Sequence, residues 1–325
     1  MLAASLADNL LTAPVIAFLV ALVATLMKFE VRLPESLYPI LSTFLLLAIG
    51  IKGGKALGAS SLHDIWKPLI AAVGIGVVTP VIAFLLFRWI GRLDTVNSSA
   101  LAAHYGSVSA VTFTVVISVL DARGIEFEGF VSGLLAVLEI IGIVVALFLA
   151  NGATNATEST SDQSNWRSAL AEVVRGRSIA LLVTGLVIGA VVGKDRLEPT
   201  DPLFVGLFAG VLTLFLIEMG VIAAERLRDI RTAGLKVVIL GIVIPLVNGM
   251  IGAVAGSLAG LSTGGVAVMA TLAGSASYIA APAAVRIALP KASPGIYVTA
   301  SLGITFPFNL TIGIPTYIAM AQLLT

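Results

Sequence analysis

Long apolar runs with almost no charge recur along the whole chain and constrain its fold more than any other feature. Charged residues make up only 11% of the 325 residues and hydrophobic residues 58%, and the mean hydropathy is +1.07. Soluble domains carry about 25% charged residues. A water-soluble core of this size has no room for so much apolar surface. The sequence therefore predicts an all-α protein that spans a lipid bilayer.

Ten segments are long and apolar enough to be membrane spans, for which a helix needs about 20 residues. Five lie near Leu10–Met27, Leu37–Ile51, Leu69–Ile90, Ser98–Leu120 and Phe130–Ala150, and five near Ile179–Val192, Leu203–Ala224, Val237–Leu261, Gly265–Leu289 and Gly295–Leu324. The N-terminal run has no basic segment before it, so we interpret it as the first span rather than a signal peptide. We interpret Gly53-Gly54 as a bend at a helix end.

The two halves share short motifs in the same order. Val78-Thr-Pro80 corresponds to Val243-Ile-Pro245, and Gly106-Ser-Val-Ser109 corresponds to Gly274-Ser-Ala-Ser277. Five spans in each copy would place the copies in opposite orientations, so we expect two inverted repeats. The expected division is a first repeat at 1–151, a polar connector at 152–176 and a second repeat at 177–325. The alternative is chance similarity between helices rich in Gly, Ala and Val.

The basic residues are distributed unevenly between the predicted loops. Thirteen of the 19 Lys and Arg residues follow odd-numbered spans and six follow even-numbered spans. The positive-inside rule then places the odd loops and the polar connector in the cytoplasm and both termini outside. We expect a multi-pass protein of the bacterial inner membrane.

Two short polar motifs interrupt the apolar runs of the fourth and ninth predicted spans. Each holds two serines, and Pro282, which lacks an amide donor, follows the second motif. An interrupted helix leaves amide donors free at a positive dipole end, and two such ends that meet can hold a small anion. The alternative is that the serines only hydrogen-bond to carbonyls or to neighbouring helices. The candidate substrate-binding residues are Gly106, Ser107, Val108 and Ser109 in the first motif and Gly274, Ser275, Ala276 and Ser277 in the second.

Two carboxylates, Glu139 and Glu218, lie inside apolar runs, where an ionisable side chain is costly and is a functional candidate. Glu139 could supply an oxygen ligand to a hard cation such as Na⁺. It could instead relay protons, or bridge two helices as a neutral acid. Asn309 takes the corresponding place in the second half, as a polar ligand or as an interhelical hydrogen-bonding residue.

Composition excludes several kinds of site. The chain has no cysteine, so disulfides and thiolate metal sites are impossible, and two histidines are too few for a histidine-rich metal site. A net charge of +1 gives no sign of a nucleic-acid partner. His104 with Ser107 or Ser109 suggests an intramembrane serine hydrolase as a remote alternative, but no third residue orients such a base.

The chain resembles the cyanobacterial sodium-dependent bicarbonate transporters (SbtA type) over nearly its whole length. The resemblance rests on the run from Ala-Pro282-Ala-Ala-Val-Arg286 to Leu-Pro290-Lys-Ala-Ser-Pro294, on Ile-Pro315-x-x-Ile318 with Ala-Gln322-Leu-Leu, and on Ile49-Gly50-Ile-Lys-Gly53-Gly54 with Gly106-x-Val-Ser109-x-x-Thr112. It implies ten spans in two inverted repeats, a homotrimer, a core domain that moves against a gate domain in elevator fashion, and a PII-like cytoplasmic regulator. It also implies that bicarbonate binds between the two broken helices with Na⁺ close by.

Two residues depart from the pattern of that family. An acidic residue of the family is replaced by Tyr278, and a serine of the family is replaced by Val111. Both changes remove oxygen ligands, so they bear on the sodium site and on which anion is bound. The connector is also shorter than in the cyanobacterial proteins, which bears on the regulator.

We therefore predict sodium-coupled symport of bicarbonate, or of a similarly small anion, by alternating access, with Na⁺ as coupling ion and no organic cofactor. Na⁺ is expected near Ser109, Thr112, Glu139 and Ser277, and Asn309 is expected to assist. One alternative is a permease of the same architecture for another small anion or organic acid, driven by protons or sodium. Another is a membrane subunit that transports nothing.

Overall fold

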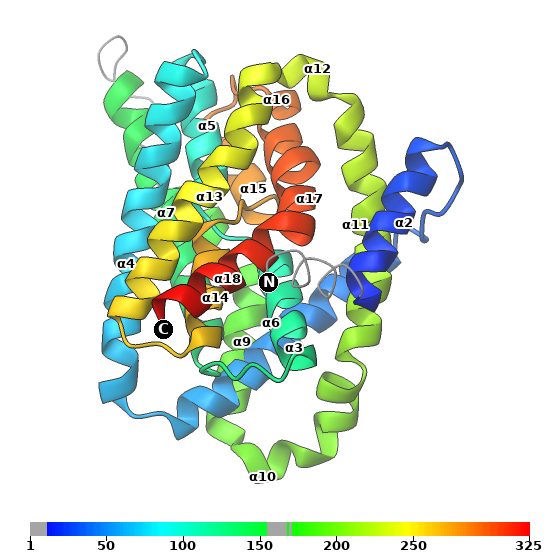
Figure 1. Cartoon of the computed structure of the whole chain (residues 1–325), viewed down its shortest axis with the longest axis vertical. Helices are drawn as coiled ribbons and strands as arrows, with labels where there is room; N and C mark the ends of the chain where they lie inside the picture. The colour runs from blue at the N-terminus through cyan, green and yellow to red at the C-terminus, as the bar shows by residue number, and fades with distance from the viewer. Residues whose placement is uncertain (1–11, 155–167, 169–170) are drawn as a thin grey trace.

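All elements of the described part of the chain, residues 12–154, 168 and 171–325 of the computed structural model, are helical (Figure 1). The first half contains α2 (Ala13–Leu26), α3 (Leu37–Ala59), α4 (Leu62–Leu85), η1 (Leu86–Ile90), α5 (Thr95–Gly106), α6 (Ala110–Ala122) and α7 (Val131–Thr154). The second half contains α9 (Arg177–Val192), α10 (Lys194–Leu197), η2 (Glu198–Thr200), η3 (Pro202–Gly206), α11 (Phe208–Arg228), α12 (Ile230–Ala233), α13 (Leu235–Leu258), α14 (Thr263–Ala273), α15 (Ala280–Ala288), α16 (Pro294–Val298), η4 (Thr299–Thr305), α17 (Phe306–Phe308), η5 (Asn309–Gly313) and α18 (Ile314–Leu324). Most of the predicted connector 152–176 lies outside the described residues.

Seven helical segments among the described residues are long and apolar enough to cross a membrane. They are Leu37–Ala59, His63–Ile90, Thr95–Ala122, Val131–Ala150, Phe208–Arg228, Leu235–Leu258 and Pro294–Leu324. Three shorter apolar helices, α2, α9 and α14, lie where the first, sixth and ninth spans were predicted. The expectation of an all-helical membrane protein is therefore confirmed.

The helix at the second predicted span is longer than expected, and the prediction of a bend at Gly53-Gly54 is wrong. Helix α3 continues to Ala59, with both glycines buried inside it. A Cβ atom at Gly54 would meet the Leu186 carbonyl oxygen and the Cα of Gly189 on α9. The glycines therefore allow close helix packing, which in lipid depends on small residues at the contact.

The last predicted span is a single helical run, but it alternates between α and π geometry. The π-helical stretches η4 and η5 precede α17 and α18, which carry Pro307 and Pro315 in their first turns. Proline cannot donate to the helical ladder, and a local change of helical register accommodates this loss.

The helices pack in two groups. The frame consists of α2, α3, α9 and α11, in which α2 packs against α11 and α3 packs against α9. Figure 1 shows α2 and α11 side by side at the right of the molecule. The core consists of α4 to α7 and α13 to α18, and it meets the frame mainly where α3 contacts α7 and where α11 contacts η4.

The loop between α2 and α3 is fastened to α11 by charged side chains. Nη2 of Arg32 lies 2.9 Å from Oε2 of Glu225, and Nε of Arg32 lies 3.5 Å from Oε1 of Glu218. The main-chain amide of Leu33 also donates to Oε2 of Glu218 at 3.1 Å. Glu218 thus has partners for both carboxylate oxygens and holds the frame together.

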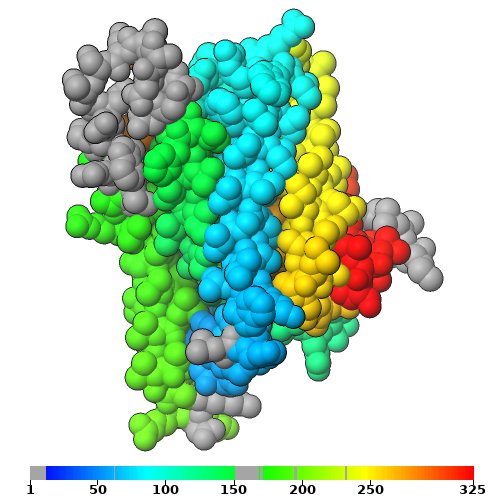
Figure 2. Space-filling model, turned by 90° about the vertical axis from the view of Figure 1, so that its left-hand side faces the viewer, coloured from blue at the N-terminus to red at the C-terminus, as the bar shows by residue number. Residues whose placement is uncertain are grey.

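Apolar side chains are exposed along one long face of the core. Figure 2 shows this face, with α4 running its length beside α13. The exposed apolar residues include Ile70, Val73 and Val77 of α4 and Ile239, Val243 and Val247 of α13. Such a surface is unfavourable in water and is expected of helices that face lipid hydrocarbon.

The contact between α3 and α9 can be tested by adding one methyl group. We expect Gly54→Ala to destabilise the protein by about 1–3 kcal/mol, because the new Cβ would overlap the backbone of α9. The matched control is Gly74→Ala in α4, where a Cβ would meet no atom within 4 Å. The control should be neutral or stabilising by about 0.5–1 kcal/mol. Thermal unfolding in detergent measures both, and equal melting temperatures for the two variants would contradict the packing argument.

Candidate functional site

The two interruptions expected from the serine motifs are both present, and they lie together inside the core. The first separates α5 from α6 at residues 107–109, and the second separates α14 from α15 at residues 274–279. Ser107, Ser109, Ser275 and Ser277 are all buried. Each interruption places the end of one half-helix and the start of the next at the same depth in the core.

Glycine allows neighbouring helices to pack closely where each first half-helix ends. A Cβ at Gly106 would meet the ring of Pro80 on α4, 2.5 Å from its Cβ atom, and a Cβ at Gly274 would lie 2.7 Å from the carbonyl oxygen of Pro245 on α13. A Cβ at Gly142 of α7 would meet the Gly106 carbonyl. The matched prolines of the two halves therefore contact the matched glycines, at distances that only glycine tolerates.

The second serine of each motif accepts a hydrogen bond from a main-chain amide in the first turn of the half-helix that follows it. Oγ of Ser109 accepts a hydrogen bond from the amide of Thr112 at 3.1 Å, at the start of α6. Oγ of Ser277 accepts from the amide of Ala281 at 3.3 Å, at the start of α15. Pro282 lies in the first turn of α15, where a missing amide donor removes no helical hydrogen bond. Ser109 and Ser277, which correspond in the two halves, therefore each fix the start of the following half-helix.

Hydrogen bonds join the two interruptions directly. The amide of Ser109 donates to Oγ of Ser275 at 2.9 Å, and the same Oγ donates to the Leu272 carbonyl at 2.8 Å. The amide of Ser277 donates to the His104 carbonyl at 2.7 Å. The hydroxyl of Ser275 therefore bonds both to a carbonyl of α14 and to the other interruption, and the two motifs lie in contact.

A small cavity lies at this junction. It is lined by Val108 and Ser109 from the first interruption, Ala110 at the start of α6, Ser277, Tyr278 and Ile279 from the second interruption, Glu139 from α7 and Ser178 from α9. Its volume, measured as the space open to the centre of a water molecule, is about 10 Å³. That is room for roughly one water molecule.

Several polar atoms at the junction are buried and lack a hydrogen-bond partner among the described residues. They are Oε2 of Glu139, the hydroxyl of Tyr278 and Oγ of Ser107. Glu139 is only 3% exposed. A buried carboxylate oxygen without a partner is costly, so it indicates a ligand or a proton at this position. Carboxylate and hydroxyl oxygens are the donors that a hard cation prefers.

The predicted site residues differ in how close they lie to the cavity. Val108, Ser109, Ser277 and Glu139 line it, and Thr112 and Ser275 each hydrogen-bond to Ser109. Gly106, Ser107, Gly274 and Ala276 form the adjoining backbone and are not among the lining residues.

Asn309 serves as an interhelical hydrogen-bonding residue rather than lining the cavity. Its Nδ2 donates to the Gly274 carbonyl at 2.9 Å, and its Oδ1 accepts from the Tyr317 hydroxyl at 2.9 Å. Asn309 therefore holds the C-terminal end of α14 in place.

Ser178 and Tyr278 line the cavity without having been chosen as candidate ligands from the sequence. In the sequence, Tyr278 stands out only as a departure from the family pattern. Ser178 follows Arg177 at the start of an ordinary apolar run, and no local pattern distinguishes it. It reaches the cavity because α9 packs beside α7.

His104 is not arranged as a catalytic base. Nδ1 of its ring lies 2.7 Å from the Ala100 carbonyl, so this nitrogen carries the proton, and the ring lies 4.7 Å from the ring of Tyr297. Nε2 has no hydrogen-bond partner among the described residues. This histidine therefore activates none of the serines in the described part of the chain.

The sequence was also compared with known proteins. A sequence model described as the Na⁺-dependent bicarbonate transporter superfamily matches residues 14–322. No curated protein matches the chain. The family match covers both interruptions and every residue that lines the cavity.

The bond between the two interruptions can be tested by removing one hydroxyl. We expect Ser275→Ala to destabilise the protein by about 1–3 kcal/mol, because the buried amide of Ser109 would lose its acceptor. Thr271→Val is the matched control: its hydroxyl donates only to the Ala267 carbonyl of its own helix, so its loss orphans no amide. Thermal unfolding in detergent compares the two, and a control as unstable as Ser275→Ala would refute the assignment.

Proposed function

The chain belongs to the Na⁺-dependent bicarbonate transporter superfamily, and we propose on this premise that it carries bicarbonate together with Na⁺ by alternating access. Membership of a transporter family means that the protein is not an enzyme. The observation that supports sodium coupling best is the buried, unpartnered carboxylate of Glu139 at the junction of the two interruptions.

The anion is proposed to bind at the starts of α6 and α15. Both helix N-termini lie at the junction, where first-turn amides such as those of Ala110 and Val111 have no acceptor within their own helix. These amides and the helix dipoles favour a negative charge. A hydroxyl that accepts one hydrogen bond can still donate its proton, so Ser109 and Ser277 can donate to bicarbonate while they accept from the first-turn amides of α6 and α15.

The cation is proposed to bind beside the anion, on the side of Glu139. The hydroxyls of Ser109, Ser277 and Ser178 line the same cavity as the Glu139 carboxylate. A Na⁺ ion there would balance the carboxylate and attract the anion, so each ion would raise the affinity for the other. We propose that Thr112 and Asn309 act through the backbone that they hold, at Ser109 and Gly274.

The small size of the cavity supports a mechanism with a conformational change. A space for roughly one water molecule cannot accept bicarbonate, which has four non-hydrogen atoms. The junction must therefore open before the anion enters. We propose that it opens by movement of the core against the frame, because contacts within each group are more extensive than contacts between them.

The inverted repeat is proposed on the arrangement of matched elements. In the two halves, α2 corresponds to α9 and α3 corresponds to α11. The packing of α2 against α11 therefore corresponds to the packing of α9 against α3. The contact of Gly106 with Pro80 corresponds to that of Gly274 with Pro245. These correspondences involve contacts in the folded structure rather than composition, so they support duplication of 1–151 and 177–325.

Several expectations concern partners and location. The resemblance predicts a homotrimer and a PII-like regulator at the cytoplasmic side, and the loop charges predict outside termini and a cytoplasmic connector. The bilayer itself is a partner of the exposed apolar helices. These assignments stay predictions.

Transport is tested in proteoliposomes with labelled bicarbonate. We expect faster uptake with an inward Na⁺ gradient than with an equal K⁺ gradient. Glu139→Gln removes the carboxylate charge with little change of shape, and it should lower the apparent Na⁺ affinity roughly ten- to a hundredfold. Glu30→Gln, at an exposed loop carboxylate, is the matched control and should leave uptake unchanged.

Equal uptake under Na⁺ and K⁺ gradients would refute sodium coupling. Faster uptake at low external pH with no effect of Na⁺ would favour a proton-coupled permease instead. Unlabelled nitrate, formate and acetate, added as competitors, would show whether the site with Tyr278 accepts other small anions.

A further inference from the structure

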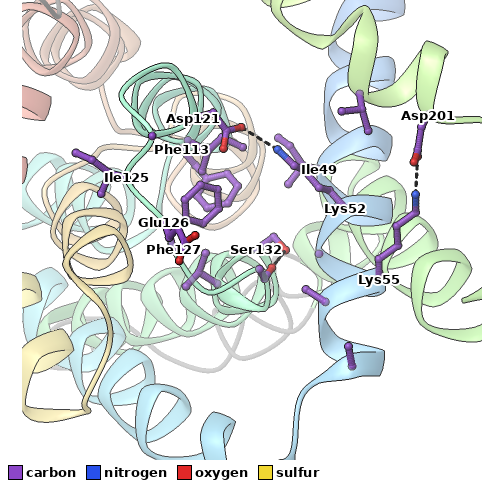
Figure 3. A pocket seen from close by; sticks show the side chains of 18 residues that line it. Ile49, Lys52, Lys55, Phe113, Asp121, Ile125, Glu126, Phe127, Ser132 and Asp201 are labelled. Atoms are coloured by element: carbon purple, nitrogen blue, oxygen red, sulfur yellow. Dashed lines mark hydrogen bonds and ion pairs between the residues drawn. The ribbon is translucent and has the colours of Figure 1, made fainter. Parts of the chain in front are cut away.

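A second, much larger cavity lies at the far end of α6. Its volume is about 760 Å³, measured in the same way as that of the small cavity. Its wall is formed by α3, α6, the loop between α6 and α7, and η3 (Figure 3). It therefore lies between the frame and the core, where relative movement of the two groups would change its shape.

One face of α6 connects the two cavities. Phe113, Ile117 and Asp121 follow one another at four-residue intervals and line the large cavity. Ser109, one turn before Phe113 on the same face, lines the small cavity. Asp121 and Ser109 are separated by about 18 Å along the helix axis. Phe113 is thus the last lining residue before Ser109, and its ring is 1% exposed.

Two ion pairs lie in the wall of the large cavity, but only one joins the frame to the core. Nζ of Lys52 on α3 lies 2.9 Å from Oδ2 of Asp121 on α6. Nζ of Lys55 lies 2.5 Å from Oδ1 of Asp201, which precedes η3 and α11. Figure 3 shows Lys52 reaching across the gap to Asp121. Both partners of the Lys52 pair are exposed, at 44% and 51% of their side-chain surfaces. An exposed pair of this kind breaks readily.

We propose that the large cavity is the outer mouth of the transport pathway. The ring of Phe113 closes the inner end of this mouth over Ser109. The Lys52–Asp121 ion pair holds α3 against α6, as a latch, while the inner end is closed. The proposal rests on the proposed transport function. The end of the molecule that holds this mouth carries the loops that are poor in Lys and Arg, and the positive-inside rule places them outside.

The absence of cysteine from the chain allows a direct test of the mouth. Single cysteines are introduced at Ile117 and Val205, which line the large cavity, and at Val243, which is exposed on the apolar face of α13. A charged, membrane-impermeant methanethiosulfonate is added to intact cells or to inside-out vesicles. We expect Ile117→Cys and Val205→Cys to react from outside roughly tenfold faster than Val243→Cys, because thiol reaction requires contact with water. Labelling of Ile117→Cys no faster than the lipid-facing control, or only from inside, would overturn the proposal.

The role of Phe113 is tested with a cysteine at Ala110, which lines the small cavity. Ala110→Cys should react slowly alone and roughly tenfold faster with Phe113→Ala, because the path from the mouth would then be open. Phe127→Ala removes a ring of the same size from another part of the large cavity and should not accelerate the reaction. Normal labelling of Ile117→Cys in the Phe113→Ala background shows that the variant has folded. Slow labelling of Ala110→Cys in that folded variant would sink the assignment of the gate.

The latch is tested by exchanging its charges. Lys52→Asp or Asp121→Lys alone places like charges together and should speed the labelling of Ala110→Cys, whereas the double exchange should restore the slow rate. Asp201→Asn, which breaks the pair within the frame, should have no effect. Unchanged rates in both single variants would refute the latch.

None of these labelling reactions requires transport. If Na⁺ drives bicarbonate uptake but Ile117→Cys does not react, only the assignment of the large cavity as the outer mouth would be overturned. A reactive mouth without bicarbonate uptake would overturn the transport proposal alone.

Discussion

Two interrupted helices that satisfy each other's backbone groups are the interaction on which the structure depends. In hydrocarbon no water can bond to a free amide or carbonyl, so an interrupted helix persists only where protein supplies the partner. Here the amide of Ser109 finds the Ser275 hydroxyl, and the amide of Ser277 finds the His104 carbonyl. Neither interruption would be stable without the other. This mutual dependence fixes both at one depth and leaves two helix N-termini facing the same few atoms.

The sequence predicted this arrangement because the required chemistry is local. Small hydroxyl residues beside a glycine inside an apolar run indicate an interrupted helix. The matched prolines in the preceding spans indicate that the two interruptions occupy equivalent places in two related halves. The lengths of helices were harder to predict. Gly53 and Gly54 indicated a bend when considered as isolated residues, but they lie inside α3 because α9 packs against that face. A glycine that turns the chain and one that admits a neighbour are identical in sequence, and only the neighbour distinguishes them.

Glu139 and Glu218 show that local sequence also cannot decide which buried carboxylate has a functional role. Both lie inside apolar runs, where an ionisable side chain is costly, so the sequence indicates both as functional candidates. The structure separates them, since Glu218 is held by Arg32 and Leu33, whereas Oε2 of Glu139 has no partner among the described residues. Arg32 is far from Glu218 in the chain, and Ser178 is far from Glu139. Such long-range neighbours carry no local signal, which is why Ser178 could not be found from its own surroundings.

The unpartnered carboxylate of Glu139 has a consequence for how tightly transport is coupled. In the proposed cycle this group stays buried in the core each time the carrier changes sides. A bare negative charge makes that passage unfavourable, and a bound cation neutralises it. The carrier would then seldom cross with bicarbonate alone, so movement of the anion without Na⁺ would be suppressed. One acidic side chain would thus serve both as a ligand and as a safeguard against leak.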